Sequence, residues 1–363
     1  MAITTLTLAN KWRPNSLADI VGQDNAVQIV QDSIDSGEFS SAYLLTGKTG
    51  CGKTTLALII SAALSCMKGN ACGKCGACKA GKSNPDFKHL DAATSGKVDD
   101  IRELCKLAYV NPMYGRRVIL IDECHMLTGA AAQALLITLE NPPANTVFIL
   151  CTTDPEKLLP TIRNRCTQIA LLDVPAPQMV KRMITIVRKE YKAKRKELDK
   201  EAIKPGLRMV AELADGSMRQ ALALLETVIN SDMLPATIES RFRSSNKSLV
   251  DNYQAAATTV AAVLQGDIKK SICAIRSAEQ RSIIYELTNL LDNVIGKMCG
   301  YSDSNTYSMR LLRDIVKKEG IDIDINILSL YLARVSDIKY ENLYKTTLQN
   351  ITVVFINEQF SNE

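Results

Sequence analysis

The segment AYLLTGKTGCGKTT, residues 42 to 55, constrains the fold of this chain more than any other feature. A short apolar run comes first, a glycine-rich turn follows, and an apolar helical pattern begins near Lys53. Strand, loop and helix in this order are typical of a P-loop, whose backbone N–H groups converge on phosphate oxygens at the positive end of a helix. The sequence therefore predicts an α/β domain with a parallel sheet.

The spacing of Gly47, four residues, Gly52, Lys53 and Thr54 matches the Walker A pattern. In such a loop the lysine holds the β- and γ-phosphates and the hydroxyl ligates Mg²⁺. The flanking strand and helix argue against the alternative, a glycine-rich turn that matches by chance. The residues expected to contact nucleotide are Gly47, Lys48, Thr49, Gly50, Cys51, Gly52, Lys53, Thr54 and Thr55.

An acidic partner for the P-loop follows in RRVILIDECHML, where four apolar residues precede Asp122 and Glu123. The apolar run is explained by a buried strand. We expect Asp122 to hold the Mg²⁺ shell and Glu123 to orient or deprotonate the attacking water. Two ordinary carboxylates at the end of a buried strand are the alternative.

A further apolar strand is predicted in NTVFILCTTDPEKLLPTIRNRC, and it ends on Thr152 and Thr153. A hydroxyl at the end of a strand beside the Asp122 strand can reach the γ-phosphate or its water. Arg163 and Arg165 follow about a dozen residues later. We expect them at the domain edge, where an arginine can serve the nucleotide of a neighbouring subunit.

Four of the 11 cysteines lie in CMKGNACGKCGAC, residues 66 to 78. The thiolates of Cys66, Cys72, Cys75 and Cys78 could complete a tetrahedral Zn²⁺ site with no open position, so the sequence predicts a structural zinc module. Free thiols in a flexible loop and an iron–sulfur cluster are the alternatives. An odd number of cysteines in a long chain favours a reduced compartment over a disulfide framework.

The composition excludes several classes of protein. With 363 residues and 46% hydrophobic residues, the chain is long enough for two or three globular domains. The net charge of +5 is mild, so any contact with DNA must be argued from local features. Because it shows neither a leader-like start nor a run of about 18 apolar residues, we expect an intracellular, cytoplasmic protein without a membrane anchor.

Eight motifs in order make the chain resemble the AAA+ clamp-loader ATPases, and within them the gamma/tau family of bacterial DNA polymerase III, across about residues 9 to 232. They are KWRPNSLADIVGQD, GKTGCGKTT, the four cysteines, LDAATSGKVDDIREL, VILIDECHML, QALLITLENPP, CTTDPEKLLPTIRNRC and DGSMRQALAL. The resemblance implies an α/β ATPase domain over 1–174 with the inserted zinc module, a small helical lid over 175–235 and an all-α collar over 236–363. Because the sequence ends early compared with the long tau form, the chain resembles the short gamma form.

The same resemblance implies roles for residues whose own chemistry is only suggestive. Thr153 matches the sensor 1 position, and Arg219 matches sensor 2 on the lid. Arg165 matches the arginine finger that acts on the ATP of the adjacent subunit. Surface ion pairing is the alternative for both arginines. The segment that lines adenine and ribose would comprise Lys11, Arg13, Pro14, Val21 and Gly22.

Possible DNA contacts are confined to a few places. Ser95, Gly96 and Lys97 precede a helix with acidic residues near its start, and the resemblance implies that they follow the DNA backbone. An ordinary capped helix is the alternative. The basic run 181–200 is predicted to be a solvated helix face, and residues 234–248 to be a polar linker.

The function expected from the resemblance is an ATP-driven motor that uses ATP, Mg²⁺ and Zn²⁺. It would act with other clamp-loader subunits in a ring of five, with a sliding clamp, with primer–template DNA and with a single-strand DNA-binding protein. A non-hydrolysing stator subunit, a branch-migration helicase motor and an ATP-switched DNA-binding regulator are the alternatives. Intact Lys53, Thr54, Asp122 and Glu123 argue against the stator, and the cysteines and the TLENPP segment argue against the helicase. No recognisable DNA-reader domain supports the regulator.

Overall fold

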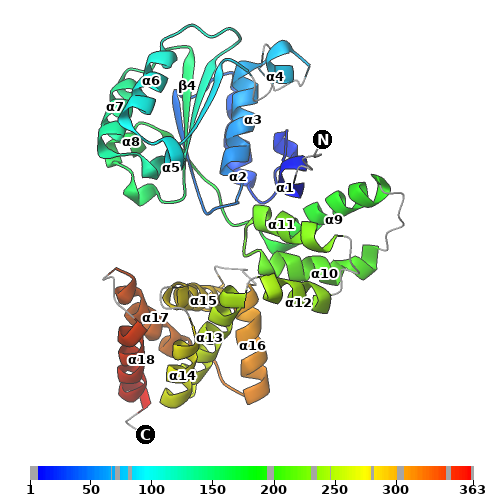
Figure 1. Cartoon of the computed structure of the whole chain (residues 1–363), viewed down its shortest axis with the longest axis vertical. Helices are drawn as coiled ribbons and strands as arrows, with labels where there is room; N and C mark the ends of the chain where they lie inside the picture. Colours follow the sequence, from blue (N-terminus) through cyan, green and yellow to red (C-terminus); the bar gives the residue numbers. More distant parts are fainter. Residues whose placement is uncertain are drawn as a thin grey trace. The chain divides into compact units, whose positions relative to one another are not determined.

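A computed structural model of the chain describes residues 7–66, 68–69, 74–80, 84–193, 200–229, 235–245, 247–278, 282–300, 306–340 and 345–360. The chain divides into two compact units (Figure 1). One unit comprises residues 1–174 together with 216–223, and the other comprises 175–215 together with 224–363. The separate lid and collar domains expected within the second unit stay a prediction.

The first unit is built on a parallel sheet of five strands in the order β2-β3-β4-β1-β5. The strands are β1 (Ala42–Thr46), β2 (Phe87–Asp91), β3 (Arg117–Asp122), β4 (Thr146–Thr152) and β5 (Thr167–Ala170). Since β4 lies between β1 and β3, the carboxyl end of β4 lies between the P-loop and Asp122. This edge of a parallel sheet is where ligands bind in open α/β folds.

Helices cover both faces of this sheet (Figure 1). Tyr43 and Leu45 pack in one apolar cluster with α2 and α3, whereas Leu44 packs in the other with α6, α7 and α8. Burial on both faces explains why the strands read as continuous apolar runs. The helices are α1 (Leu8–Lys11), η1 (Leu17–Asp19), α2 (Asp24–Ser36), α3 (Lys53–Ser65), α4 (Gly76–Ala80), α5 (Ala92–Ser95), α6 (Val98–Ala108), η3 (Cys124–Met126), α7 (Gly129–Glu140), η4 (Pro155–Lys157) and α8 (Pro160–Arg163).

A buried ion pair fixes the start of the β2–β3 pair. Arg117 Nη2 lies 3.2 Å from Asp86 Oδ1, and both side chains are almost completely buried. Arg117 Nη1 also donates to the carbonyl oxygens of Leu107 and Val110 at the end of α6. The other Asp86 oxygen accepts from the Tyr114 N–H at 2.7 Å. These contacts tie the loop that follows α6 to the sheet.

The second unit is helical in all of its described secondary structure, as the apolar spacing predicts for the C-terminal region. Its helices are α9 (Ala176–Ala193), α10 (Lys200–Leu213), α12 (Pro235–Ser245), α13 (Lys247–Leu264), α14 (Ile268–Ser277), α15 (Ser282–Met298), α16 (Tyr307–Glu319), α17 (Ile325–Tyr340) and α18 (Lys345–Phe360). Residues 218–223 of α11 (Met218–Val228) belong to the first unit and the rest to the second. In the described chain, no helix is both long and apolar enough to cross a bilayer.

The prediction of a polar linker over 234–248 is wrong. Helix α12 occupies 235–245, and α13 begins at Lys247. Ile238 and Phe242 are one helical turn apart and both are buried. Since the rest of the segment is polar, two apolar anchors on one face suffice to dock it, and the overall polarity of the sequence conceals this face.

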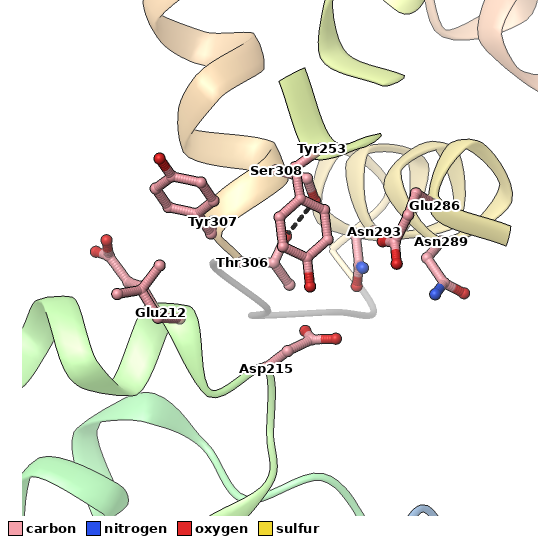
Figure 2. A pocket seen from close by; sticks show the side chains of 10 residues that line it. Glu212, Asp215, Tyr253, Glu286, Asn289, Asn293, Thr306, Tyr307 and Ser308 are labelled. Carbon is pink, nitrogen blue, oxygen red and sulfur yellow. Dashed lines mark hydrogen bonds between the residues drawn. The ribbon is translucent and has the colours of Figure 1, made fainter. Parts of the chain in front are cut away.

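An acidic pocket lies wholly within the second unit (Figure 2). It is lined by Glu212 in the last turn of α10, by Asp215 just beyond that helix, by Glu286, Asn289 and Asn293 on α15, and by Thr306 where α16 begins. None of the described residues that line it is basic. Its volume of about 10 Å³ accommodates roughly one water molecule.

Candidate active site

The glycines of the P-loop are required by close approaches of the backbone. A Cβ added to Gly47, which has a φ of 143°, would lie 2.4 Å from the Leu171 carbonyl oxygen. A Cβ added to Gly50, with a φ of 85°, would lie 2.0 Å from Ser217 Oγ. Side chains at these positions would force the loop away from its neighbours, so glycine keeps the backbone N–H groups in place.

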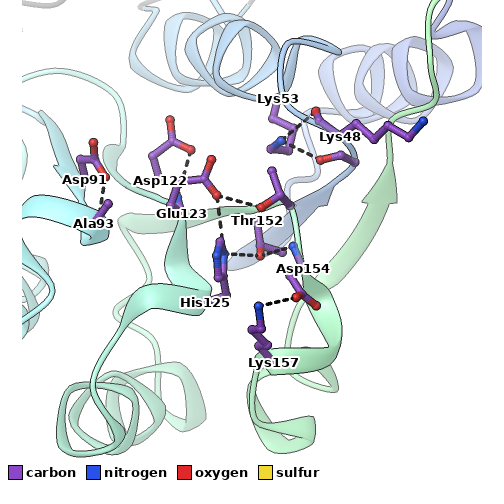
Figure 3. Close-up of polar contacts among 12 residues, drawn as sticks. Lys48, Lys53, Asp91, Ala93, Asp122, Glu123, His125, Thr152, Asp154 and Lys157 are labelled. Atoms are coloured by element: carbon purple, nitrogen blue, oxygen red, sulfur yellow. Dashed lines mark hydrogen bonds and ion pairs between the residues drawn. The ribbon is translucent and has the colours of Figure 1, made fainter. Parts of the chain in front are cut away.

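Lys53 begins α3 and is buried, although it carries a charge. Its Nζ donates to the carbonyl oxygens of Gly47 at 2.7 Å and of Lys48 at 3.0 Å. The ammonium group therefore lies across the loop that the sequence predicts to bind phosphate (Figure 3). A buried ammonium group is stabilised only where acceptors or anions face it.

Thr54 and Asp122 meet although 68 positions separate them in the sequence. The Thr54 hydroxyl donates to Asp122 Oδ2 at 2.8 Å. Both are hard oxygen ligands of the kind that Mg²⁺ uses together with phosphate oxygens. The donor set thus fits a magnesium ion held between α3 and the end of β3.

Glu123 has an unusual backbone conformation directly after β3. Its φ of 48° and ψ of 44° are left-handed, which costs about 1–2 kcal/mol for a residue with a side chain. The strain is offset in part by local contacts. Its N–H donates to Asp122 Oδ1 at 3.1 Å, and its Oε2 accepts from the Thr153 hydroxyl at 3.3 Å. The structure thus brings Thr153 and Glu123 together.

His125 and Thr152 also belong to this cluster. The sequence places Thr152 at the end of β4 but gives the sensor position to Thr153, and it gives His125 no role. His125 Nδ1 lies 3.0 Å from Thr152 Oγ1 and 3.5 Å from Glu123 Oε2. The available signal was weak: a histidine two residues beyond the predicted base, and a second hydroxyl at the end of β4. Only the sheet order brings the two segments together.

Two arginines lie near the P-loop within the first unit. A Cβ added to Gly50 would lie 3.2 Å from Arg219 Cβ, so the predicted sensor 2 residue is next to the loop. The pKa of Arg13 is lowered mainly by burial and secondly by the charge of Arg219. The charge of Asp122 acts in the other direction and raises this pKa. Arg13 therefore faces the same region as Arg219 and Asp122.

The other residues of the predicted adenine segment surround η1. Lys11 is exposed, with its Nζ 5.9 Å from the centroid of the Trp12 ring. Pro14, Val21 and Gly22 are partly buried. Within this segment, the charge of Arg13 interacts with that of Asp122.

Gln23 was missed by the sequence analysis. This buried amide receives the Leu172 N–H at 2.9 Å and donates to the Leu172 carbonyl at 2.6 Å and to the Cys51 carbonyl at 3.4 Å. It thereby joins the P-loop to the segment after β5. Nearby, Lys48 pairs with Asp173 at 2.7 Å. Local sequence gives no sign of these pairings, which depend on how the chain closes around the loop.

Arg165 makes an ion pair within its own chain. Its Nη2 lies 2.7 Å from Glu140 Oε1 at the end of α7, and its Nη1 donates to the Thr161 carbonyl at 2.9 Å. The guanidinium remains one-third exposed. The isolated chain thus contains the surface ion pair that is the alternative for this residue. Its action as an arginine finger on a neighbouring subunit stays a prediction.

Three of the four clustered cysteines converge. The Sγ atoms of Cys66, Cys75 and Cys78 lie within 4.8 Å of one another, and those of Cys66 and Cys75 are 3.9 Å apart. Thiolates bound to one tetrahedral zinc ion at about 2.3 Å are about 3.8 Å apart, so the spacing fits this ion. Cys72, the fourth predicted ligand, lies outside the described residues.

The predicted DNA segment lies close to the segment after β3. Ser95 ends α5, and Lys97 is the exposed N-cap of α6. A Cβ on Gly96 would lie 2.4 Å from the Ala92 carbonyl, and the Gly96 carbonyl accepts from the Thr128 N–H at 3.4 Å. This geometry fits an ordinary helix start, and it fits equally well a loop that contacts the backbone of DNA.

Comparisons with known proteins decide the family. The profile described as DNA polymerase III, delta subunit, matches residues 22–175. The DNA polymerase III subunit gamma of Buchnera aphidicola subsp. Schizaphis graminum is 34% identical over 298 residues, which cover 79% of each chain. The chain belongs to the DNA polymerase III gamma/tau family.

Other members of the gamma/tau family are longer. The tau subunit of Salmonella typhimurium is 34% identical over 297 residues, which cover 79% of this chain but 45% of that subunit. The chain thus spans about half the length of such tau relatives. The Thermotoga maritima RuvB Holliday junction branch migration motor aligns over 86% of this chain and 99% of its own, with 17% identity and a TM-score of 0.48. A likeness at this level does not bear on function.

Proposed function

We propose that this gamma/tau family protein is an ATP-driven motor subunit of a clamp loader. ATP binding would tighten an assembly of subunits that opens a sliding clamp and grips primed DNA, and hydrolysis would release both. One observation carries the proposal: the Thr54–Asp122 hydrogen bond lies beside the contact of Glu123 with Thr153. A stator subunit that only bound nucleotide would not need the second contact.

The chemistry follows from the positions of the side chains. The P-loop N–H groups and Lys53 would bind the phosphates, and Arg219 would approach them from α11. Bound between Thr54 and Asp122, Mg²⁺ would neutralise charge on the β- and γ-phosphate oxygens. Glu123 would accept a proton from the attacking water as the bond between the γ-phosphorus and the bridging oxygen breaks, which leaves ADP and phosphate.

Hydrolysis at full rate would need a second subunit. Arg165 would leave Glu140 and place its charge on the ATP of the adjacent subunit. Fingers of this kind contribute about 10³ to 10⁵ in rate. A ring of five subunits, with the helical second unit as lid and collar, would set this geometry.

The remaining contacts concern zinc, DNA and the partners. The four cysteines would hold a structural zinc ion. Ser95, Gly96 and Lys97 would follow the phosphate backbone of the primer–template junction without reading sequence. A sliding clamp, other clamp-loader subunits and a single-strand DNA-binding protein complete the proposed set of partners in the cytoplasm.

The test compares ATP hydrolysis by the purified chain, alone and in an assembly with partner subunits, with and without primed DNA and a sliding clamp. We expect hydrolysis to rise only when all are present. Glu123→Gln should keep ATP binding and lose hydrolysis, whereas Glu103→Gln, on the exposed face of α6, should keep both. A wild-type chain that binds ATP without ever hydrolysing it would identify a stator instead.

A further inference from the structure

His125 contacts the predicted base and lies within the VILIDECHML motif, but the sequence analysis gives it no role. Its side chain is 11% exposed, and it belongs to the short helix η3 that begins one residue after Glu123. Figure 3 shows its ring between the Glu123 carboxylate and the end of β4. A histidine in this place contacts two segments that meet at the hydrolytic site.

Thr152 gives this histidine a rigid anchor. It is the last residue of β4, is completely buried, and pairs in register with Thr46 at the start of the P-loop. Its Oγ1 accepts from the Asp154 N–H at 3.0 Å, so the hydroxyl is fixed on both sides. Lys157, 2.8 Å from Asp154, holds the loop beyond it.

The contacts indicate where the ring carries its proton. A carboxylate only accepts hydrogen bonds, and the lone pair of an unprotonated Nδ1 would be repelled by an oxygen 3.5 Å away. We therefore assign the proton to Nδ1, which donates it to Thr152 Oγ1 at 3.0 Å and lies 3.5 Å from Glu123 Oε2.

Glu123 needs such support. Its backbone is left-handed and its side chain is 31% exposed, so the carboxylate can adopt several rotamers. In the described chain, Thr153 and His125 are the two side chains with polar contacts to it. Both contacts lead to the end of β4, one directly and the other through Thr152.

We propose that His125 is a positioning residue: anchored on Thr152, it holds the Glu123 carboxylate toward the attacking water and couples it to the end of β4. This inference rests on the proposed function. Misplacing a reacting group by about 1 Å can cost about a hundredfold in rate. Loss of the imidazole contact should therefore lower the rate of hydrolysis and leave the binding of ATP as it is.

The test uses two substitutions of nearly equal shape. His125→Leu removes the donor, whereas His125→Asn keeps an N–H donor on the atom next to Cγ. In the complete assembly with primed DNA and clamp, His125→Leu should lower kcat by about tenfold to a hundredfold with KM unchanged, and His125→Asn should restore most of it. Thr152→Val and Thr152→Ser form a second pair. Thr152→Val, which loses the hydroxyl, should lower kcat, and Thr152→Ser, which keeps it, should restore most of the rate.

His89, the chain's other histidine, is exposed on β2 and gives the control His89→Leu. Equal losses in His125→Leu and His125→Asn would show that only the packing of the ring matters and would overturn the proposal. So would a kcat in His125→Leu that is unchanged or raised while Glu123→Gln is inactive. If Glu123→Gln kept full turnover, the proposed function itself would fail, which separates the two conclusions.

Discussion

The Thr54 hydroxyl donates a 2.8 Å hydrogen bond to Asp122, and this contact joins the P-loop helix to the end of β3. The other Asp122 oxygen, Oδ1, accepts the Glu123 N–H at 3.1 Å. An oxygen pair at the mouth of a P-loop is suited to share one hard cation. The contact therefore connects the two Walker motifs through the ion that both are expected to bind.

Thr54→Val should remove the response to magnesium. The variant keeps the shape of the side chain but loses the ligand oxygen, so added Mg²⁺ should no longer strengthen ATP binding. Hydrolysis should fall by about tenfold to a hundredfold. Thr54→Ser, which keeps the hydroxyl, is the matched control. ATP titrations with Mg²⁺ and with a chelator check this, and a Thr54→Val chain that responds to Mg²⁺ like the wild type contradicts it.

The cysteine module should carry about one zinc ion per chain. Cys75→Ser or Cys78→Ser should lower the zinc content to near zero and lower the melting temperature, because ion binding stabilises the fold that presents the ligands. Cys273→Ser, at an exposed thiol on α14, should change neither. Elemental analysis and thermal unfolding measure both quantities. A wild-type chain purified without zinc would remove the site from the proposal.

Breaking the buried pair of Arg117 and Asp86 should be far more costly than breaking an exposed pair. Arg117→Leu leaves the Asp86 charge buried and the Leu107 and Val110 carbonyls unpaired, which should lower the free energy of unfolding by about 3–5 kcal/mol. Arg102→Leu, which breaks an exposed pair with Asp99, should cost less than about 1 kcal/mol. Urea unfolding of the two variants decides this, and equal losses would count against the role given to the buried pair.

Glu286 should make the second unit less stable as the pH rises. Burial, and then the charge of Asp215, raise the pKa of its carboxyl to about 7, from an ordinary value of 4.5. The folded state therefore binds this proton more tightly than the unfolded state does. The contribution is fully present below pH 4.5 and is lost as the pH rises through 7.

Glu286→Gln should flatten this dependence. The amide stays neutral, so the variant should exceed the wild type in free energy of unfolding at about pH 8 by at most about 3 kcal/mol, and the difference should shrink at about pH 4. The exposed Asp322→Asn should leave the wild-type profile unchanged. Urea unfolding across this range provides the measurement, and parallel curves for wild type and Glu286→Gln would contradict it.

The parts of the site that sequence could predict are those set by neighbours along the chain. Spacing alone identifies the P-loop and the acidic pair after β3, because strand, turn and helix must follow one another for the chemistry to work. Gln23 and His125 escaped notice because their partners, Leu172 and Thr152, come from distant segments. Sheet order brings those segments together, and no periodicity in a single sequence encodes it.

Helix α12 shows the complementary failure. Its composition resembles a linker, and only the burial of Ile238 and Phe242 one turn apart reveals a docked face. Two apolar residues among polar ones are too few to stand out from chance in a periodicity argument. Tertiary packing decides such segments, so their prediction requires the neighbours that cover them.

Arg165 should act on a neighbour's nucleotide and not on its own. Arg165→Ala should keep ATP binding and should lower hydrolysis stimulated by clamp and primed DNA by about 10³-fold or more. Glu140→Gln removes the partner that holds the guanidinium at 2.7 Å, and it should preserve or raise the stimulated rate because the finger is released more easily. Mixing Arg165→Ala chains with Glu123→Gln chains should restore part of the activity, since some subunit interfaces then combine an intact base with an intact finger. Stimulated turnover that survives Arg165→Ala, or a parallel loss of ATP affinity, would show that the arginine serves only the ion pair within its own chain.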